Sequence, residues 1–216
     1  MLVDFQRSRF GAIPAELEFD ATRSGPPAWT PRQAFGRPSW RVLADPFAPS
    51  PELVLVRAAT APDHDPIALL RGVTVRDLSA SVFIKPMGGG RGSGAGLAWR
   101  VHDPDTYQAV LADARSHQLR LLAVAGGRAR LLATAPIRIG IEYERRTPSP
   151  THGWFKLRID VSGERVTAWF DGRRTIELAD QSRIRAGGVG LITQADAVAA
   201  FDDLHIRYLT RGTEGP

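Results

Sequence analysis

The sequence predicts an all-β protein: a single jelly-roll β-sandwich of two antiparallel sheets. Residues 107–201 divide into short segments in which apolar and polar side chains alternate, and glycine-rich turns join these segments. Asp171 and Gly172 separate two such segments, and an Asp-Gly pair in this position is a strong short-range signal of a β-hairpin. The length of 216 residues suits one sandwich domain, which we place at 1–209, followed by a flexible C-terminal tail at 210–216.

Prolines are dense between residues 14 and 51. Because proline lacks a backbone N–H and breaks helices, this region is expected to run along sheet edges, with neither long helices nor central strands. The elements expected up to residue 105 are short extended pieces at 17–22, 40–43 and 53–57, a long strand at 73–86 with a bulge near Asp77, a glycine-rich loop at 88–94, a buried strand at 97–101 and a turn at 102–105.

Residues 107–123 can be interpreted in two ways. Their content of Ala, Leu, Gln and Arg favours a helix by intrinsic propensity. The alternation of their apolar residues favours two strands that join near Ala114. Gly126 and Gly127 follow, and Gly-Gly is a preferred two-residue loop of β-hairpins. We therefore predict strands here.

The clearest alternation lies in residues 155–162. Four apolar residues alternate there with four polar ones, a pattern typical of a strand that buries one face and keeps the other wet. Further strands are expected at 166–170, 174–178, 187–192 and 197–209.

Composition and charge exclude several classes of protein. The formal net charge is +5, but the arginines are scattered, so we expect no nucleic-acid partner. A surface for acidic polysaccharide or an anionic cell surface stays open. The chain contains no cysteine, which excludes disulfides and thiolate chemistry. No apolar run is long enough to span a membrane, and no apolar signal segment follows Met1.

Six short segments carry a family resemblance: GAGLAWR at 94–100, DPDTY at 103–107, GWFKLR at 153–158, AWFDG at 168–172, GVGL at 188–191 and FDDL at 201–204. They resemble the concanavalin A-like lectin/glucanase superfamily, in particular its bacterial branch grouped with 3-keto-disaccharide hydrolase domains. The resemblance implies a lectin-like sandwich, commonly exported to the periplasm or the extracellular space. It does not fix an activity, because the superfamily contains lectins, glycosidases and passive adhesive modules.

Four residues come closest to a sugar-binding constellation: Trp99, Arg100, Tyr107 and Trp169. Sugar recognition uses aromatic faces against the apolar side of the ring and planar donors for the hydroxyls. The resemblance implies that Trp99, Arg100 and Tyr107 lie near each other on adjacent strands. We expect the concave face to present Arg100, Tyr107 and His117 to a ligand. The alternative is that Trp99 is a core residue and Arg100 pairs with an acid.

No catalytic residue is identified. Glu16, Glu18 and Asp20 would share one side of a strand, as the paired carboxylates of a glycosidase require. The resemblance argues against this role, since jelly-roll glucanases place Glu-x-Asp-x-Glu on a central strand, and a solvated strand face is the plainer interpretation. Glu142 and Glu144 form a second candidate set, and a solvated face is again the plainer interpretation.

A structural calcium ion is a further expectation. In many lectin-like sandwiches such an ion joins the first strand to the last through a carboxylate and backbone carbonyls. Asp4 and Asp202 could supply hard oxygen ligands of this kind. The alternative is that Asp202 is an edge aspartate that caps loop amides.

The expected function is noncatalytic binding of a glycan or cell-surface polymer. Two alternatives stay open: a glycoside hydrolase acting on a (3-keto-)disaccharide or related glycoside, and a structural or protein-interaction module. Two carboxylates at hydrolytic separation in one groove would favour the hydrolase. An aromatic-floored groove without them would favour binding, and a face without any groove would favour the third interpretation. The oligomeric state is left open.

Overall fold

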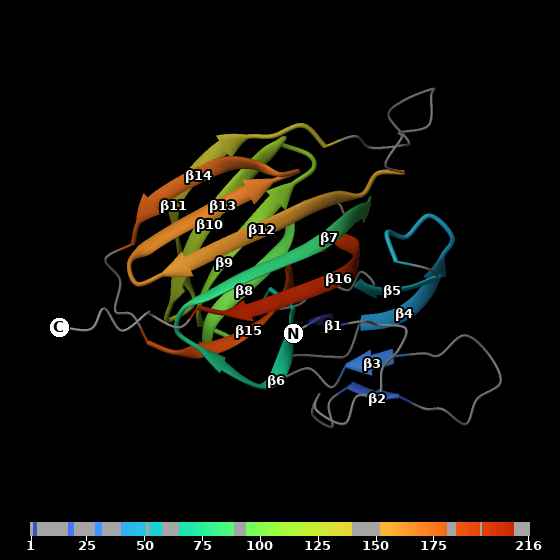
Figure 1. The fold of residues 1–216 in the computed structure, drawn as a ribbon, viewed down its shortest axis with the longest axis horizontal. Helices are drawn as coiled ribbons and strands as arrows, with labels where there is room; N and C mark the ends of the chain where they lie inside the picture. The colour runs from blue at the N-terminus through green and yellow to red at the C-terminus, as the bar shows by residue number, and fades with distance from the viewer. Residues whose placement is uncertain are drawn as a thin grey trace.

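A computed structural model shows an all-β architecture, as the sequence predicts (Figure 1). It describes residues 2–3, 17–19, 29–31, 40–50, 52–57, 65–88, 94–139, 152–180, 185–194 and 196–209. Within these ranges the chain forms strands and turns only, and no helix that could cross a membrane occurs there. The predicted tail at 210–216 lies outside the described ranges.

One sheet has eight strands, all antiparallel to their neighbours. Its order is β14 (Arg173–Ala179), β13 (Arg165–Phe170), β12 (Phe155–Ser162), β7 (Leu78–Gly88), β16 (Val198–Tyr208), β5 (Glu52–Arg57) and β4 (Trp40–Asp45), and β1 (Leu2–Val3) also pairs with β16. The strand β4, from the proline-rich region, lies at an edge of this sheet, where the sequence analysis expects it.

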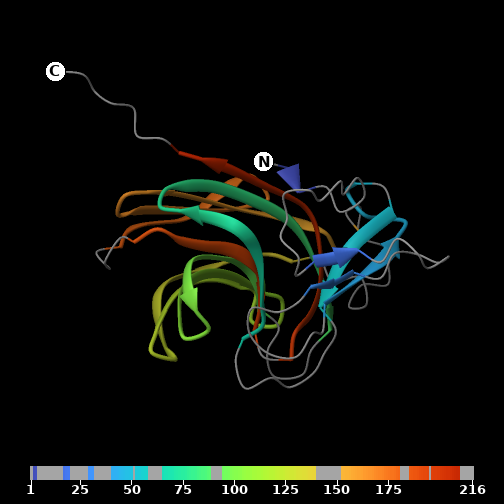
Figure 2. The ribbon, with the colours of Figure 1, turned by 90° about the horizontal axis from the view of Figure 1, so that it is seen from below.

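The other large sheet has six antiparallel strands. Its order is β11 (Arg128–Pro136), β10 (Gln118–Ala125), β9 (Thr106–Asp113), β8 (Gly94–Asp103), β15 (Gly187–Thr193) and β6 (Ile67–Val75). A separate two-stranded sheet joins β2 (Leu17–Phe19) to β3 (Trp29–Pro31). Figure 2 shows the two large sheets stacked as curved layers.

The main core lies between the two large sheets. In β12 the alternation read from the sequence places Leu157, Ile159 and Val161 inside, each 0% exposed, and leaves the polar residues between them on the outer face. Burying an aliphatic side chain of this size contributes about 1.5–3 kcal/mol. Thirty-two of the residues that the structure describes form this one buried cluster, which holds the sheets together.

The prediction of one continuous strand at 73–86 with a bulge near Asp77 is wrong. The chain does not bulge at Asp77; it crosses there from β6 in the six-stranded sheet to β7 in the eight-stranded sheet. The buried Asp77 carboxylate stabilises this crossing, because its Oδ1 accepts a hydrogen bond of 2.8 Å from the backbone N–H of Gly163.

Residues 107–123 form the two strands β9 and β10, so the prediction of strands is confirmed. Gly126 and Gly127 close the β10–β11 hairpin with φ angles of 55° and 73°, the left-handed conformation that a two-residue hairpin turn requires. Asp171 and Gly172 adopt φ angles of 46° and 77° in the β13–β14 hairpin for the same reason.

Small residues on the outer face of the six-stranded sheet bring its strands unusually close. A Cβ atom on Gly96 would lie 1.8 Å from the carbonyl oxygen of Val110, and one on Gly190 would lie 2.4 Å from that of Ala68. The face forms a second buried apolar cluster: Ile67, Ala98, Val101, Tyr107, Ala109, Leu111, Leu122, Val124 and Ile192. This sheet therefore buries apolar side chains on both of its faces.

Candidate functional site

Trp99 lies in the core between the sheets. Its side chain is 0% exposed and belongs to the main apolar cluster, so no face of its ring is open to a ligand. For this residue the structure favours the core alternative that the sequence analysis left open. Trp99 packs in the core, and its part in ligand binding stays a prediction.

Arg100 follows Trp99 with a φ of 50°, and this turn of the backbone directs its side chain into the end of the sandwich. Its Nη1 donates to Oε1 of Gln108 at 3.1 Å and lies 3.7 Å from Oδ2 of Asp180. Its Nη2 donates to the carbonyl oxygen of Gly163 at 2.8 Å. Burial lowers the pKa of the guanidinium, and the charge of Asp180 opposes this shift. Arg100 thus ties the six-stranded sheet to the β12–β13 turn of the other sheet.

A pocket of about 460 Å³ lies at this end of the sandwich, and we call it the end pocket. Arg100, Tyr107, Gln108, His102, Arg128 and Arg130 are among its lining residues. The structure therefore brings together two of the predicted ligand-binding residues, Arg100 and Tyr107. The Tyr107 hydroxyl donates to Oδ2 of Asp65 at 3.3 Å, and burial, followed by the charge of Asp65, raises its pKa.

His117 is not part of the end pocket. It lies in the exposed turn between β9 and β10, at the opposite end of β9 from Tyr107. Its backbone carbonyl accepts a hydrogen bond from the N–H of Ile137 at 2.9 Å, and its φ of 54° suits this turn. The structure thus separates His117 from Arg100 and Tyr107.

Asp202 is 0% exposed and caps a loop. Its Oδ2 accepts from the N–H of Ser50 at 2.7 Å, and its Oδ1 accepts from Ser50 Oγ at 2.7 Å and from the N–H of Asp203 at 2.8 Å. Burial raises the pKa of this carboxyl, while the bonds from Ser50 act in the opposite direction. Three of about four acceptor positions of the carboxylate are thus occupied.

As placed, Asp202 does not fit a calcium ligand well, because those hydrogen bonds would have to break. The other residue of the expected site, Asp4, lies outside the described ranges. Among the residues that the structure describes, no group of three or more His, Cys, Asp or Glu side chains could hold a metal ion. The calcium site stays a prediction.

The carboxylate candidates for catalysis are likewise untested. Glu16, Asp20, Glu142 and Glu144 lie outside the described ranges, and Glu18 lies in β2. A catalytic role for either set of carboxylates therefore stays untested.

The outer face of the eight-stranded sheet carries a second hollow, of about 360 Å³, which we call the trough. It is lined by eight residues: Ser79, Ser81, Lys156, Arg158, Trp169, Gly172, His205 and Arg207. They come from four neighbouring strands, β13, β12, β7 and β16, and from the β13–β14 turn.

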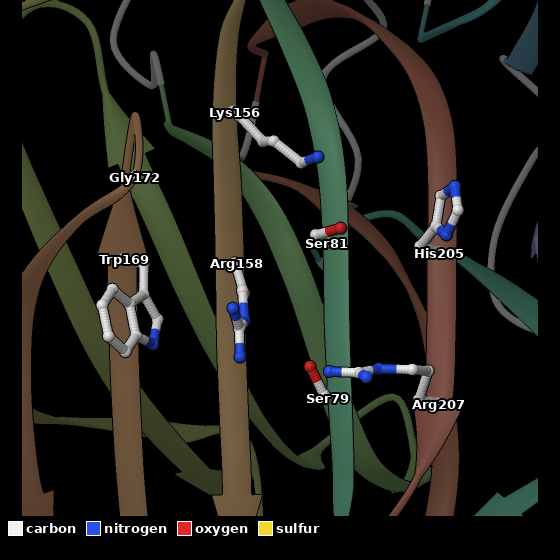
Figure 3. Close-up of a pocket in the computed structure, with 8 residues that line it drawn as sticks. All are labelled: Ser79, Ser81, Lys156, Arg158, Trp169, Gly172, His205 and Arg207. Carbon is white, nitrogen blue, oxygen red and sulfur yellow. The ribbon is translucent and has the colours of Figure 1, made fainter.

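Strand register explains why a hollow forms here. Trp169 pairs with Arg158, Arg158 with Ser81, and Ser81 with His205, so these side chains form one row across the sheet. The two short serine side chains on β7 lie between long side chains on β12 and β16. The serines form the floor of the trough, and the long side chains form its two walls (Figure 3).

One wall of the trough is held in a fixed geometry. Nε and Nη2 of Arg158 bond both oxygens of Asp160, at 3.0 and 2.6 Å, and the guanidinium carbon lies 5.3 Å from the centre of the Trp169 ring. A planar guanidinium held by a carboxylate and an aromatic ring loses little further freedom on binding. Trp169 is partly exposed, and Figure 3 shows its indole spread over β13 beside Arg158.

Sequence reasoning identified Trp169 but missed most of the trough. The alternation of 155–162 already assigns Lys156 and Arg158 to a wet strand face. The pairing of β7 with both β12 and β16, which adds Ser79, Ser81 and Arg207, joins segments more than 70 and 110 residues apart and has no local signal.

The similarity of this chain to known proteins is a similarity of fold. No protein-family model and no curated protein matches the chain by sequence. Among solved structures, the carbohydrate binding module CBM66 from Bacillus subtilis aligns with a TM-score of 0.59 and 20% identity, covering 78% of this chain and 95% of that one.

Two further solved structures align in the same way. A Bacillus subtilis protein with a galectin-like fold has a TM-score of 0.54 and 13% identity, covering 80% of this chain and 88% of its own. Domain 4 of AbnA, a GH43 extracellular arabinanase from Geobacillus stearothermophilus in complex with arabinotriose, has a TM-score of 0.52 and 12% identity, covering 77% and 74%. This chain has the concanavalin A-like β-sandwich fold that these lectin-like and carbohydrate-binding domains share.

Proposed function

We propose that the protein binds saccharides without cleaving them, and that the trough is the binding site. The observation that carries this proposal is the row Trp169, Arg158, Ser81 and His205 across four adjacent strands. It combines an aromatic surface, a planar donor fixed by Asp160, and hydroxyl and imidazole groups in one open hollow. These are the groups by which proteins recognise the apolar and polar sides of a sugar ring.

The fold supports this proposal independently of the trough. CBM66 and the arabinanase domain are sandwiches of the same architecture, one a carbohydrate-binding module and the other solved with arabinotriose. Fold likeness at this level of identity does not locate the site. Binding through Arg100, Tyr107 and His117, as the sequence analysis expects, stays a prediction, with Arg100 and Tyr107 in the end pocket as its basis.

A glycoside hydrolase is the alternative function, suggested by the resemblance to 3-keto-disaccharide hydrolase domains. Glycoside cleavage needs two carboxyl groups about 5–9.5 Å apart across the substrate. None of the eight residues that line the trough is an acid. The trough therefore favours binding, and a hydrolytic site would have to lie elsewhere in the chain.

The test is a glycan array with the purified full-length chain, followed by titration calorimetry with the bound saccharides. Trp169→Ala should weaken binding about tenfold, since a partly buried aromatic residue in a binding site commonly contributes more than 1 kcal/mol. Tyr208→Ala is the matched control, because Tyr208 is a 53% exposed aromatic residue of β16 that does not line the trough.

Two results would overturn the proposal. Absence of binding to any saccharide would remove the function, and unchanged binding by Trp169→Ala would remove the trough as its site. Incubation of each bound saccharide with the protein, followed by chromatography, distinguishes binding from hydrolysis, because only a hydrolase releases shorter products.

A further inference from the structure

We infer that the trough selects an acidic saccharide chain, one whose carboxylate or sulfate groups meet cations at both ends of the hollow. This inference rests on the proposed function, because it concerns the same site. Sequence composition leaves an acidic polysaccharide open but gives it no location. The structure places unpaired positive charge at the trough.

The charges that line the trough are all positive. Lys156, Arg158 and Arg207 line it, together with His205, and no acid does. Arg158 is neutralised by Asp160 at 2.6 Å. Lys156 and Arg207 form no ion pair with any residue that the structure describes, so two cations are available to a ligand.

Neighbouring groups do not cancel these two charges. Asp171 lies near Lys156 and its Oδ1 accepts a hydrogen bond of 2.7 Å from the backbone N–H of that residue, but it forms no ion pair with the Lys156 amine. The side-chain Nζ of Lys156 lies 5.0 Å over the ring of Phe83, a weak contact at an exposed site. Arg165 and Arg174, on the adjoining strands, both pair with Glu177.

The two available cations lie at opposite ends of the trough. Figure 3 shows the Lys156 amine and the Arg207 guanidinium both reaching over β7 from opposite sides. Lys156 pairs with Phe83 and Arg207 pairs with Ser79, so their positions differ by four residues along β7. At about 3.3 Å per residue this is roughly 13 Å, a span that suits two anionic groups on one extended chain rather than a single small anion.

The serine floor favours an acidic saccharide over other polyanions. Ser79 and Ser81 provide hydroxyl groups and leave space for a ring, and Trp169 provides an apolar surface beside it. Nucleic acid fits less well, because its affinity comes from many phosphate contacts in a line, and the trough offers two unpaired cations. A neutral sugar would fill the space but leave both cations without a partner.

The experiment compares saccharides that differ only in charge. Titration calorimetry of the full-length chain uses oligogalacturonates of defined length and their methyl esters, and dextran sulfate against dextran tests the sulfate group in the same way. We expect the acid to bind at least tenfold more tightly than its ester at low salt. Added NaCl should weaken binding of the acid and leave that of the ester unchanged, because salt screens exposed charge pairs.

Charge variants then locate the effect. Lys156→Gln and Arg207→Gln should each weaken acid binding about fivefold, the upper range for an exposed ion pair, and the double variant about 25-fold if the effects multiply. Neither should change binding of the ester. Arg138→Gln is the matched control, since it removes the same charge from an exposed position that lines neither the trough nor the end pocket. Thermal melts verify that each variant is folded.

The outcomes distinguish the selection of acidic saccharides from saccharide binding itself. Equal affinity for acid and ester overturns the acidic inference and leaves saccharide binding intact. Binding of neither pair, together with an empty glycan array, removes the proposed function itself. Equally tight binding of polyglutamate or single-stranded DNA that depends on Lys156 and Arg207 but not on Trp169 shows a general polyanion surface, and it also overturns the inference.

Discussion

The outer faces of the two sheets have opposite character. On the eight-stranded sheet, β12 leaves Lys156 exposed and Arg158 half-buried on a face that carries the trough. On the six-stranded sheet, the corresponding face carries Tyr107, Ala109 and Leu111, all buried at 6% exposure or less. The strand β12 of the eight-stranded sheet thus has one dry and one wet face, whereas β8 and β9 of the six-stranded sheet are buried on both faces over most of their length.

This difference shows where a polar ligand can be bound. A strand that is buried on both faces has no outward polar side chains to present, whereas a strand with one wet face presents a row of them. The six-stranded sheet therefore contributes to the end pocket only through residues near strand ends and turns, such as Arg100 and His102. The trough uses the middle of the eight-stranded sheet.

The largest expected effect tests whether the six-stranded sheet requires its small residues. Gly96→Ala would place a Cβ atom 1.8 Å from the backbone oxygen of Val110, which cannot rotate away. The strands β8 and β9 would have to separate, and we expect a loss of about 3 kcal/mol or more in the free energy of unfolding. Urea denaturation measures it.

Gly94→Ala is the control for that change, since it lies on the same strand. Its added Cβ atom would lie 3.3 Å from the ends of the Arg120 and Gln194 side chains, which can shift, and 3.5 Å from Cβ of Gln194, an ordinary van der Waals contact. We expect a loss below about 1 kcal/mol. Equal losses in the two variants would show that close strand approach at Gly96 is not what this sheet depends on.

The same contrast explains which parts of the fold could be predicted from sequence. Alternation in residues 155–162 exists because β12 has one wet face, so its strand could be predicted directly. In β9 both Tyr107 and Gln108 are buried, as are the next four residues, so the pattern that separates strand from helix is weak. The Gly126–Gly127 turn, rather than periodicity, decided the prediction.

Site prediction was limited for a related reason. Local sequence cannot distinguish Trp99, which is fully buried in the core, from Trp169, which borders the trough, because each stands in a short apolar strand. Their difference arises from which strands lie beside them. The sequence predicts Arg100 as a ligand-binding residue or as the partner of an acid, but it does not indicate which groups Arg100 contacts, because Asp180 and Gly163 lie more than 60 residues away in the chain.

Two arginines, one on each sheet, provide the second test of the comparison. Arg100 is 4% exposed, and Arg100→Ala would remove the cation that lies beside the buried Asp180 carboxylate and donates to Gln108. We expect a loss of about 3 kcal/mol, because removing one partner of a buried ion pair is strongly destabilising. Arg158→Ala removes a pair in which the two side chains are 41% and 24% exposed, and should lower stability by no more than about 1 kcal/mol.

Chemical denaturation of both variants at neutral pH measures this difference. Because Arg158 lines the trough, its replacement should weaken saccharide binding while changing stability little. Arg100→Ala should instead lower stability strongly and change saccharide binding little. Similar stability losses in the two variants would contradict the distinction drawn between the buried and the wet arginine.

The pH dependence contributed by Asp202 is the smallest expected effect. It tests where the solvent-exposed part of the outer face of the eight-stranded sheet ends. Segment 45–50 covers that face over Asp202, and burial there raises the pKa of the carboxyl above its ordinary value of 3.8. The folded protein therefore binds this proton more tightly than the unfolded chain does. Stability should rise as pH falls through the raised pKa and should decline as pH rises through it.

The effect of Asp202 can be isolated by comparing unfolding free energies between pH 4 and pH 7 for the wild type and Asp202→Asn. The wild type should lose stability relative to the variant as pH rises just above 3.8, and the contribution of Asp171, whose pKa is also raised, cancels in the difference. Ser50→Ala should steepen this dependence, because the Ser50 hydroxyl donates to Asp202 and favours its ionised form. Parallel curves for wild type and Asp202→Asn would mean that water reaches this carboxylate, and that the wet face extends under segment 45–50.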